Sequence, residues 1–113
     1  MSMTVNDLIN SNLFSLINKG DNTEQNISKI FCCDLLSIAM GRAPADGAWV
    51  TVMGNINTLA VASLSDTACI ILAEGVTLDE TATARAAQQG ITVFTTDMPV
   101  FDAALLIHQQ LNG

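Results

Sequence analysis

Basic residues are scarce in this chain of 113 residues. Four lysines and arginines stand against eleven aspartates and glutamates, so the formal net charge is −7 at pH 7. Proteins that bind nucleic acid or anionic membranes neutralise the phosphates with lysine and arginine side chains. The composition therefore predicts a protein with neither a nucleic-acid partner nor a membrane partner.

Long apolar runs are missing as well. A membrane-spanning helix needs about 20 apolar residues, and the longest candidate, 59–72, is interrupted by Ser63 and by Ser65–Thr67. The chain does not open with a basic segment followed by an apolar one, so we expect no signal peptide. Three cysteines, two of them adjacent, do not suit a disulfide framework. Together these absences predict a reduced, cytoplasmic protein.

The sequence also lacks the motifs of phosphoryl transfer. No glycine-rich phosphate-binding loop occurs, and Lys19 and Lys29 both lie in the polar N-terminal part. The single histidine, His108, is better explained as a surface or interface residue than as a general base or pH switch. One histidine and three cysteines without the usual spacing make a poor metal site. We therefore expect no enzyme activity, no catalytic residue, no metal and no cofactor.

The chain is rich in hydrophobic residues. Half of its residues are hydrophobic and 13% are charged, against a usual charged share of about 25%. This composition excludes a disordered chain, and the length suits a single domain, residues 1–113. It also leaves more apolar surface than one small core can hide.

Strand-like and helix-like segments alternate along the chain. The sequence predicts strands at 13–17, 27–33, 48–53, 68–73 and 91–95, and helices at 4–10, 35–41, 55–64, 77–89 and 97–111. Strands separated by such helices imply crossover connections and parallel pairing. The unbroken apolar run 68–73 is typical of a strand that is buried on both faces. We therefore expect an α/β fold, a small layered domain with a mostly parallel sheet flanked by helices.

Polar residues that precede the helices predict where each helix begins. Thr4 and Asp7 form a capping box, in which each side chain accepts from a backbone N–H of the other residue. The other expected N-caps are Asp34, Asn55, Thr77 and Asp97. Gly90 is expected to end the helix that begins at Thr77.

Several short segments form a familiar series through their order and spacing. They are Asp34–Ser37, Met40–Gly41, Ala48–Thr51, Asn57–Leu64, Ala68–Leu72 and Glu74–Gly75. In this series the chain resembles the stand-alone DRTGG-domain proteins over nearly its whole length. The stretch that gives the family its name falls on 24–30, where only the acid, as Glu24, and the hydroxyl, as Ser28, are kept.

The resemblance implies an α/β domain like the N-terminal domain of HPr kinase/phosphorylase. Similar domains lie beside CBS domains in some regulated pyrophosphatases and inside some phosphotransacetylases, where they are not the catalytic unit. The resemblance thus implies a regulatory or interaction domain that acts as a homodimer or as the partner of a larger enzyme. Some relatives are described as serine kinases, but the missing phosphate-binding loop argues against that activity here.

The alternative function is a small-ligand sensor. Ligands of an open parallel sheet bind beyond the carboxyl ends of its strands, where helix N-termini offer free N–H groups. The residues expected at those ends are Gly54, Asn55, Glu74, Gly75, Thr95 and Thr96. An adenine nucleotide is the candidate ligand, with Mg²⁺ to offset the acidic surroundings. The same residues are also explained as ordinary helix caps and turns.

The predicted helix 55–64 is apolar nearly all round. A crossover helix rests on its sheet with one side only, so another surface must cover the rest. Small side chains on this helix would allow a second helix to approach closely. We therefore expect a subunit interface formed by Ile56, Leu59, Ala60, Ala62 and Ser63. Scattered apolar residues on an ordinary surface are the alternative.

Overall fold

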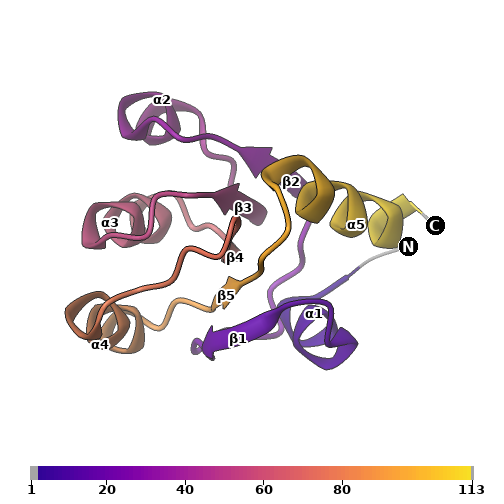
Figure 1. Ribbon diagram of the computed structural model, residues 1–113, viewed down its shortest axis with the longest axis horizontal. Helices are drawn as coiled ribbons and strands as arrows, with labels where there is room; N and C mark the ends of the chain where they lie inside the picture. Colours follow the sequence, from indigo (N-terminus) through magenta and orange to yellow (C-terminus); the bar gives the residue numbers. More distant parts are fainter. Residues whose placement is uncertain (1–2, 113) are drawn as a thin grey trace.

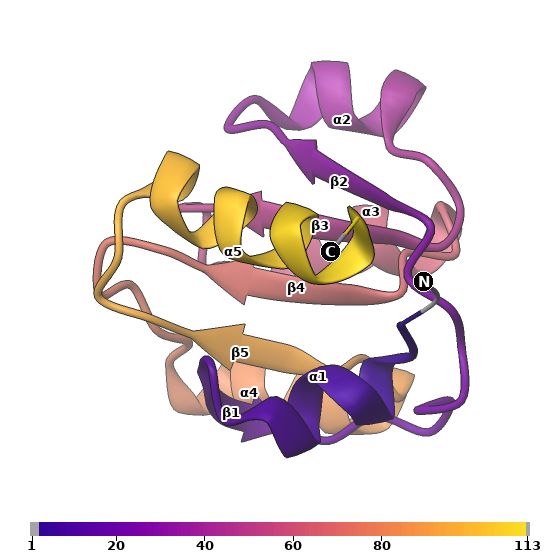
Figure 2. The same cartoon turned by 90° about the vertical axis from the view of Figure 1, so that its right-hand side faces the viewer.

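A single five-stranded sheet forms the centre of the computed structural model, which describes residues 3–112 (Figures 1 and 2). The strands are β1 (Ser15–Asn18), β2 (Lys29–Cys32), β3 (Gly47–Thr51), β4 (Cys69–Leu72) and β5 (Val93–Thr95). Their order in the sheet is β1-β5-β4-β3-β2. Only β1 runs antiparallel to its neighbour, β5, while the other three pairs are parallel. The prediction of a mostly parallel sheet is confirmed.

Helices cover both faces of the sheet. They are α1 (Val5–Ser11), α2 (Leu36–Arg42), α3 (Ile56–Leu64), α4 (Glu80–Gln89) and α5 (Val100–Asn112). Figure 1 shows α2, α3 and α4 side by side on one face, with α1 and α5 on the other. Among the described residues, no helix has the length and apolar character that a membrane span requires.

The core has two halves because successive side chains of a strand point to opposite faces. Under α2, α3 and α4 the sheet contributes Trp49, Ile70, Leu72 and Val93. Under α1 and α5 it contributes Ala48, Val50, Ile71 and Phe94. Every residue of β3 and β4 is buried, which explains why their sequences are apolar without alternation.

Three of the predicted helix signals are confirmed. The Thr4 hydroxyl accepts from the Asp7 N–H (3.1 Å), and the Asp7 carboxylate accepts from the Thr4 N–H (2.9 Å). The Asn55 side chain accepts from the N–H groups of residues 57 and 58 at the start of α3. Gly90 ends α4 with φ = 68°, a left-handed conformation that glycine adopts without strain.

The other three predicted caps are wrong. Helix α2 begins after Leu35 without a side-chain cap, because the Asp34 carboxylate accepts from the Thr51 hydroxyl (2.7 Å) and the residue-52 N–H (2.9 Å). Helix α4 is capped by Asp79 instead of Thr77. Asp97 lies three residues before α5 begins at Val100, too early to cap it.

Candidate functional site

The carboxyl ends of β3, β4 and β5 meet at one edge of the sheet. We call Gly54, Asn55, Glu74, Gly75, Thr95 and Thr96 the strand-end rim. The Gly75 N–H donates to the Thr96 carbonyl (2.9 Å), and the Thr96 N–H donates to the Leu72 carbonyl (2.9 Å). A Cβ on Gly54 would lie 2.8 Å from the carbonyl oxygen of Thr77. The loops after the three strands therefore contact one another, as the sequence predicted.

Most polar side chains of the strand-end rim already have partners within the protein. The Asn55 amide oxygen caps α3, the Thr95 hydroxyl donates to the Val76 carbonyl (2.6 Å), and the Thr96 hydroxyl accepts from the Met98 N–H (3.3 Å). Glu74 is exposed, with φ = 60°. The rim thus offers a carboxylate and backbone groups more readily than free hydroxyls, and its binding role stays a prediction.

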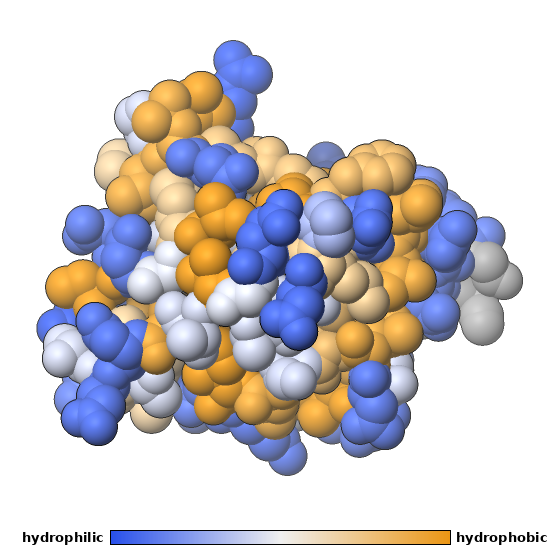
Figure 3. Space-filling model, viewed as in Figure 1, coloured by the Kyte–Doolittle hydropathy of each residue, from blue (hydrophilic) through white to orange (hydrophobic). Residues whose placement is uncertain are grey.

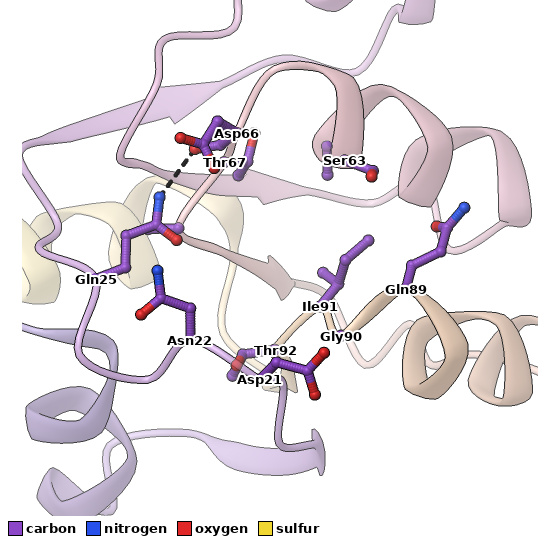
Figure 4. Close-up of a pocket in the computed structure, with 12 residues that line it drawn as sticks. Asp21, Asn22, Gln25, Ser63, Asp66, Thr67, Gln89, Gly90, Ile91 and Thr92 are labelled. Atoms are coloured by element: carbon purple, nitrogen blue, oxygen red, sulfur yellow. Dashed lines mark hydrogen bonds between the residues drawn. The ribbon is translucent and has the colours of Figure 1, made fainter.

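A second polar feature lies at the other end of the strands, where β4 and β5 begin (Figure 4). This polar cleft has a volume of about 220 Å³. Its polar side chains come from the loop before β2, the ends of α3 and α4, and the segments that follow them: Asp21, Asn22, Gln25, Ser63, Asp66, Thr67, Gln89 and Thr92. Sequence reasoning missed the cleft because these residues are far apart in the chain and each one resembles an ordinary turn residue.

Hydrogen bonds hold the wall of the polar cleft together. The Gly20 N–H donates to the Thr92 hydroxyl (2.9 Å), and the Asp21 N–H donates to the Gly90 carbonyl (3.0 Å). A Cβ on Gly20 would lie only 2.3 Å from the Gly90 carbonyl oxygen. The Gln25 amide donates to the Asp66 carbonyl (3.0 Å), the bond drawn in Figure 4. These contacts join the loop before β2 to the start of β5 and to the turn between α3 and β4.

The polar cleft has a negative character. Asp21 and Asp66 line it, and none of its lining residues is basic. Helices α3 and α4 end beside it, and the C-terminal end of a helix carries a partial negative charge. The cleft is therefore less suited to a phosphate than to a hydroxyl or an amine.

The cysteines and the histidine do not form a reactive cluster. Burial raises the pKa of the Cys69 thiol to about 12. Burial, and after it the Asp34 carboxylate, raises the pKa of Cys32. His108 is exposed at the C-terminal end of α5. Within residues 3–112, no three histidine, cysteine or acidic side chains are grouped so as to hold a metal ion.

The predicted interface on α3 needs a correction. Leu59 and Ala62 are 1% and 2% exposed, because they pack into the core. Helix α3 lies between α2 and α4, so its neighbours cover flanks that the sequence left open. Ile56, Ala60 and Ser63 are exposed. These three stay predicted interface residues, whereas Leu59 and Ala62 are core residues.

Comparisons with known proteins place this fold. Neither a family model nor a curated protein matches the chain. The structure is similar to the crystal structure of the CBS and DRTGG domains of the regulatory region of Clostridium perfringens pyrophosphatase, complexed with its activator diadenosine tetraphosphate. The TM-score is 0.77 at 16% sequence identity, and the match covers 96% of this chain and 47% of that one. This chain thus spans about half the length of its structural neighbour, and its fold is the DRTGG-like α/β fold that the sequence predicted.

Proposed function

We propose that this chain is a regulatory or interaction domain without enzymatic activity, which acts as a homodimer or as the partner of a larger enzyme. The observation that carries the proposal is the apolar surface on the outer side of α2 and α3. Met40 is 65% exposed and Leu64 is 84% exposed. Large apolar side chains that stay exposed on two adjacent helices indicate an interaction site.

The surface, which we call the α2–α3 surface, consists of exposed side chains on two adjacent helices. It comprises Leu35, Ile38, Met40, Ile56, Ala60, Ser63 and Leu64. Figure 3 shows hydrophobic atoms gathered on the lobe that α2 forms. A second copy of the chain would offer the same apolar patch, and such a self-complementary contact closes as a twofold dimer.

Sedimentation velocity at micromolar concentration tests the homodimer. We expect twice the chain mass of 11.9 kDa, and we expect Met40→Glu to shift the protein to monomer because the new carboxylate would be desolvated. Ala84→Glu, at an exposed position on α4, is the matched control and should leave the dimer intact. A wild-type monomer, or equal effects of both variants, would contradict this assembly.

The larger enzyme partner has independent support. The structural neighbour belongs to the regulatory region of a pyrophosphatase, and this chain matches about half of that region. The three free thiols fit a reduced, cytoplasmic setting. Affinity purification from native cells, with Met40→Glu as the comparison, tests this form. We expect an enzyme to be retained by the wild type and lost with the variant.

A small-ligand sensor is the second candidate function. It is supported by the contacts within the strand-end rim and by the nucleotide activator named for the structural neighbour. Amide NMR titration with adenine nucleotides, with and without Mg²⁺, tests it. Saturable changes confined to 54–57, 74–77 and 95–98 would support the sensor, and changes elsewhere or none would leave the rim as helix caps and turns.

The absence of enzymatic activity is tested separately. We expect the purified chain to release no phosphate from ATP and to transfer none to a partner protein. Phosphate release that co-elutes with the wild type and disappears in Asp34→Asn would overturn this part of the proposal.

A further inference from the structure

Strand β2 has one open side, because it is the last strand of the sheet and pairs only with β3 within residues 3–112. The Gly47 carbonyl accepts from the residue-68 N–H, so Gly47 bonds toward β4 and the next residue, Ala48, bonds toward β2. In a parallel pair only one residue of each opposing couple bonds across. Ile30, which lies opposite Ala48, therefore points its backbone N–H and C=O away from the sheet, and so does Cys32 two residues on.

The two edges of the sheet differ in how well they can accept another strand. On β1 the pairing with β5 shifts register between Leu16 and Asn18. Irregularities of this kind are a common protection of edge strands against further pairing. Strand β2 keeps an unbroken register with β3 over all four of its residues. The β2 edge is therefore the edge that can extend the sheet.

Exposed apolar side chains flank β2 on both faces of the sheet. Strand β2 lies between α2 on one face and α5 on the other (Figure 1). Helix α2 exposes Ile38 and Met40, and α5 exposes Phe101 (70%) and Leu105 (38%). Among the described residues, α1 and α4 expose no large hydrophobic side chain. The apolar surface is thus gathered where the sheet is open.

Phe101 and Leu105 lie on the side of α5 that faces β2. His108 and Asn112 line a groove together with residues 26–30 at the start of β2, so this side of the helix is the one toward that strand. Seven residues make about two helical turns. Phe101 precedes His108 by seven residues and Leu105 precedes Asn112 by seven, so both share this side of α5.

The two ends of β2 carry opposite charges. Lys29 begins the strand, and Asp34 follows two residues after its end. If two copies of β2 lie antiparallel, Lys29 of each copy comes near Asp34 of the other, and opposite charges on neighbouring strands attract. A parallel arrangement would bring the two lysines together. The charge pattern therefore favours a second copy in the antiparallel direction.

We propose that β2 pairs antiparallel with β2 of a second copy, which joins the two sheets into one continuous sheet. Ile30 of each copy lies opposite Cys32 of the other, because these residues carry the free backbone groups, and Phe31 lies at the twofold axis. The α2 helices and the Phe101–Leu105 side of α5 cover the seam from either face. This inference rests on the homodimer of the proposed function and specifies the contact at its centre.

The native cysteines test this pairing. In the proposed register the two copies of Cys32 are diagonal neighbours, with Cα atoms about 7–8 Å apart. The two copies of Cys33 lie farther apart and on the other face of the sheet. A short bismaleimide should therefore link the wild type and Cys33→Ser into covalent dimers, but not Cys32→Ser. The control is Ser15→Cys on the β1 edge, made with Cys32→Ser and Cys33→Ser, and it should not be linked.

Two substitutions of Cys32 separate backbone pairing from the loss of a side chain. Proline at an edge position removes only the outward N–H and leaves the bonds to the neighbouring strand intact. Cys32→Pro should weaken dimerisation about ten- to a hundredfold, because the dimer loses two hydrogen bonds. Cys32→Ser keeps both bonds and should leave the dimer unchanged. Sedimentation velocity measures dimerisation, and circular dichroism confirms that both variants are folded.

These results distinguish the pairing of β2 from the homodimer itself. In a dimeric wild type, the absence of Cys32 cross-links, or equal dimerisation of Cys32→Pro and Cys32→Ser, would overturn the pairing and leave the homodimer standing. A monomeric wild type would overturn both, and the open edge would then be left to a strand of a different protein.

Discussion

Helices α2 and α3 lie side by side in one layer, and both are short and apolar, yet they are buried to different extents. Helix α3 buries Thr58, Leu59, Val61 and Ala62, whereas α2 buries only Ala39. Helix α3 lies between two helices, while α2 has a neighbour on one side and stands at the β2 edge of the sheet (Figure 1). Position in the layer, more than apolar content, decides which side chains are left for a partner.

Ala62 and Ala60, two positions on α3, test most directly which side of this helix is buried. Ala62→Arg would force a charge into the core, and we expect a loss of about 3 kcal/mol or more in the free energy of unfolding. Because Ala60 belongs to the α2–α3 surface, both variants are made in the monomeric Met40→Glu background, where Ala60→Arg, at an exposed position, should change it by about 0.5 kcal/mol at most. Urea unfolding followed by circular dichroism measures both values. Similar losses in the two variants would show that the burial of α3 is wrong.

Asp34 tests how α2 is joined to the sheet. Its carboxylate accepts from the Thr51 hydroxyl and from a backbone N–H after β3, and Thr51 is fully buried. Asp34→Ala should therefore lower the free energy of unfolding by about 1–3 kcal/mol, since the buried Thr51 hydroxyl loses the acceptor of its O–H. Asp97→Ala, which removes another exposed carboxylate, is the control and should cost far less. A loss in Asp34→Ala no larger than the loss in Asp97→Ala would contradict this contact.

Helices α2 and α3 also differ in how their N-termini are capped. The Asn55 side chain caps α3, whereas Leu35 gives α2 no side-chain hydrogen bond. Asn55→Ala should cost about 1 kcal/mol of stability. In the monomeric Met40→Glu background, Leu35→Ala should cost only a few tenths of a kcal/mol, because there it removes an exposed side chain and no cap. Thermal unfolding of the two variants measures the difference, and an equal loss would contradict the cap.

The cysteines allow the edge of the sheet to be compared with its centre, and here we expect the smallest effect. Cys32 lies exposed on the edge strand β2, and Cys69 is buried in the central strand β4. Because burial raises the pKa of Cys69 to about 12, almost no thiolate forms there at pH 8, and alkylation requires the thiolate. Iodoacetamide should modify Cys69 in urea and leave it intact in the native protein. Rapid native labelling of Cys69, checked by mass spectrometry of peptides, would contradict its burial.

The sequence predicted what local patterns determine. The apolar run at β4 and the capping signals at Thr4 and Asn55 each depend on residues close together in the chain. The antiparallel pairing of β1 with β5 was not predicted, since it joins segments nearly eighty residues apart. Asp34 was assigned to the wrong partner for the same reason, because Thr51 lies in the next strand.

Of the candidate sites, too, the sequence predicted only those that depend on local patterns. The strand-end rim could be placed in advance, because in a parallel sheet the carboxyl ends of strands must share one edge. The polar cleft could not, because residues distant in the sequence assemble it. The burial of Leu59 and Ala62 also depended on which helices flank α3, a fact that the sequence pattern of α3 does not contain.

Amide hydrogen exchange at two protein concentrations tests whether a second copy covers the α2–α3 surface. We expect residues 36–42 of α2 to exchange more slowly at high micromolar than at nanomolar concentration, because the dimer protects them. The buried side of α3, at 58–62, should show a smaller change, since the monomer already covers it. Exchange of α2 that is independent of concentration, or protection that rises only in α4 or α5, would contradict it.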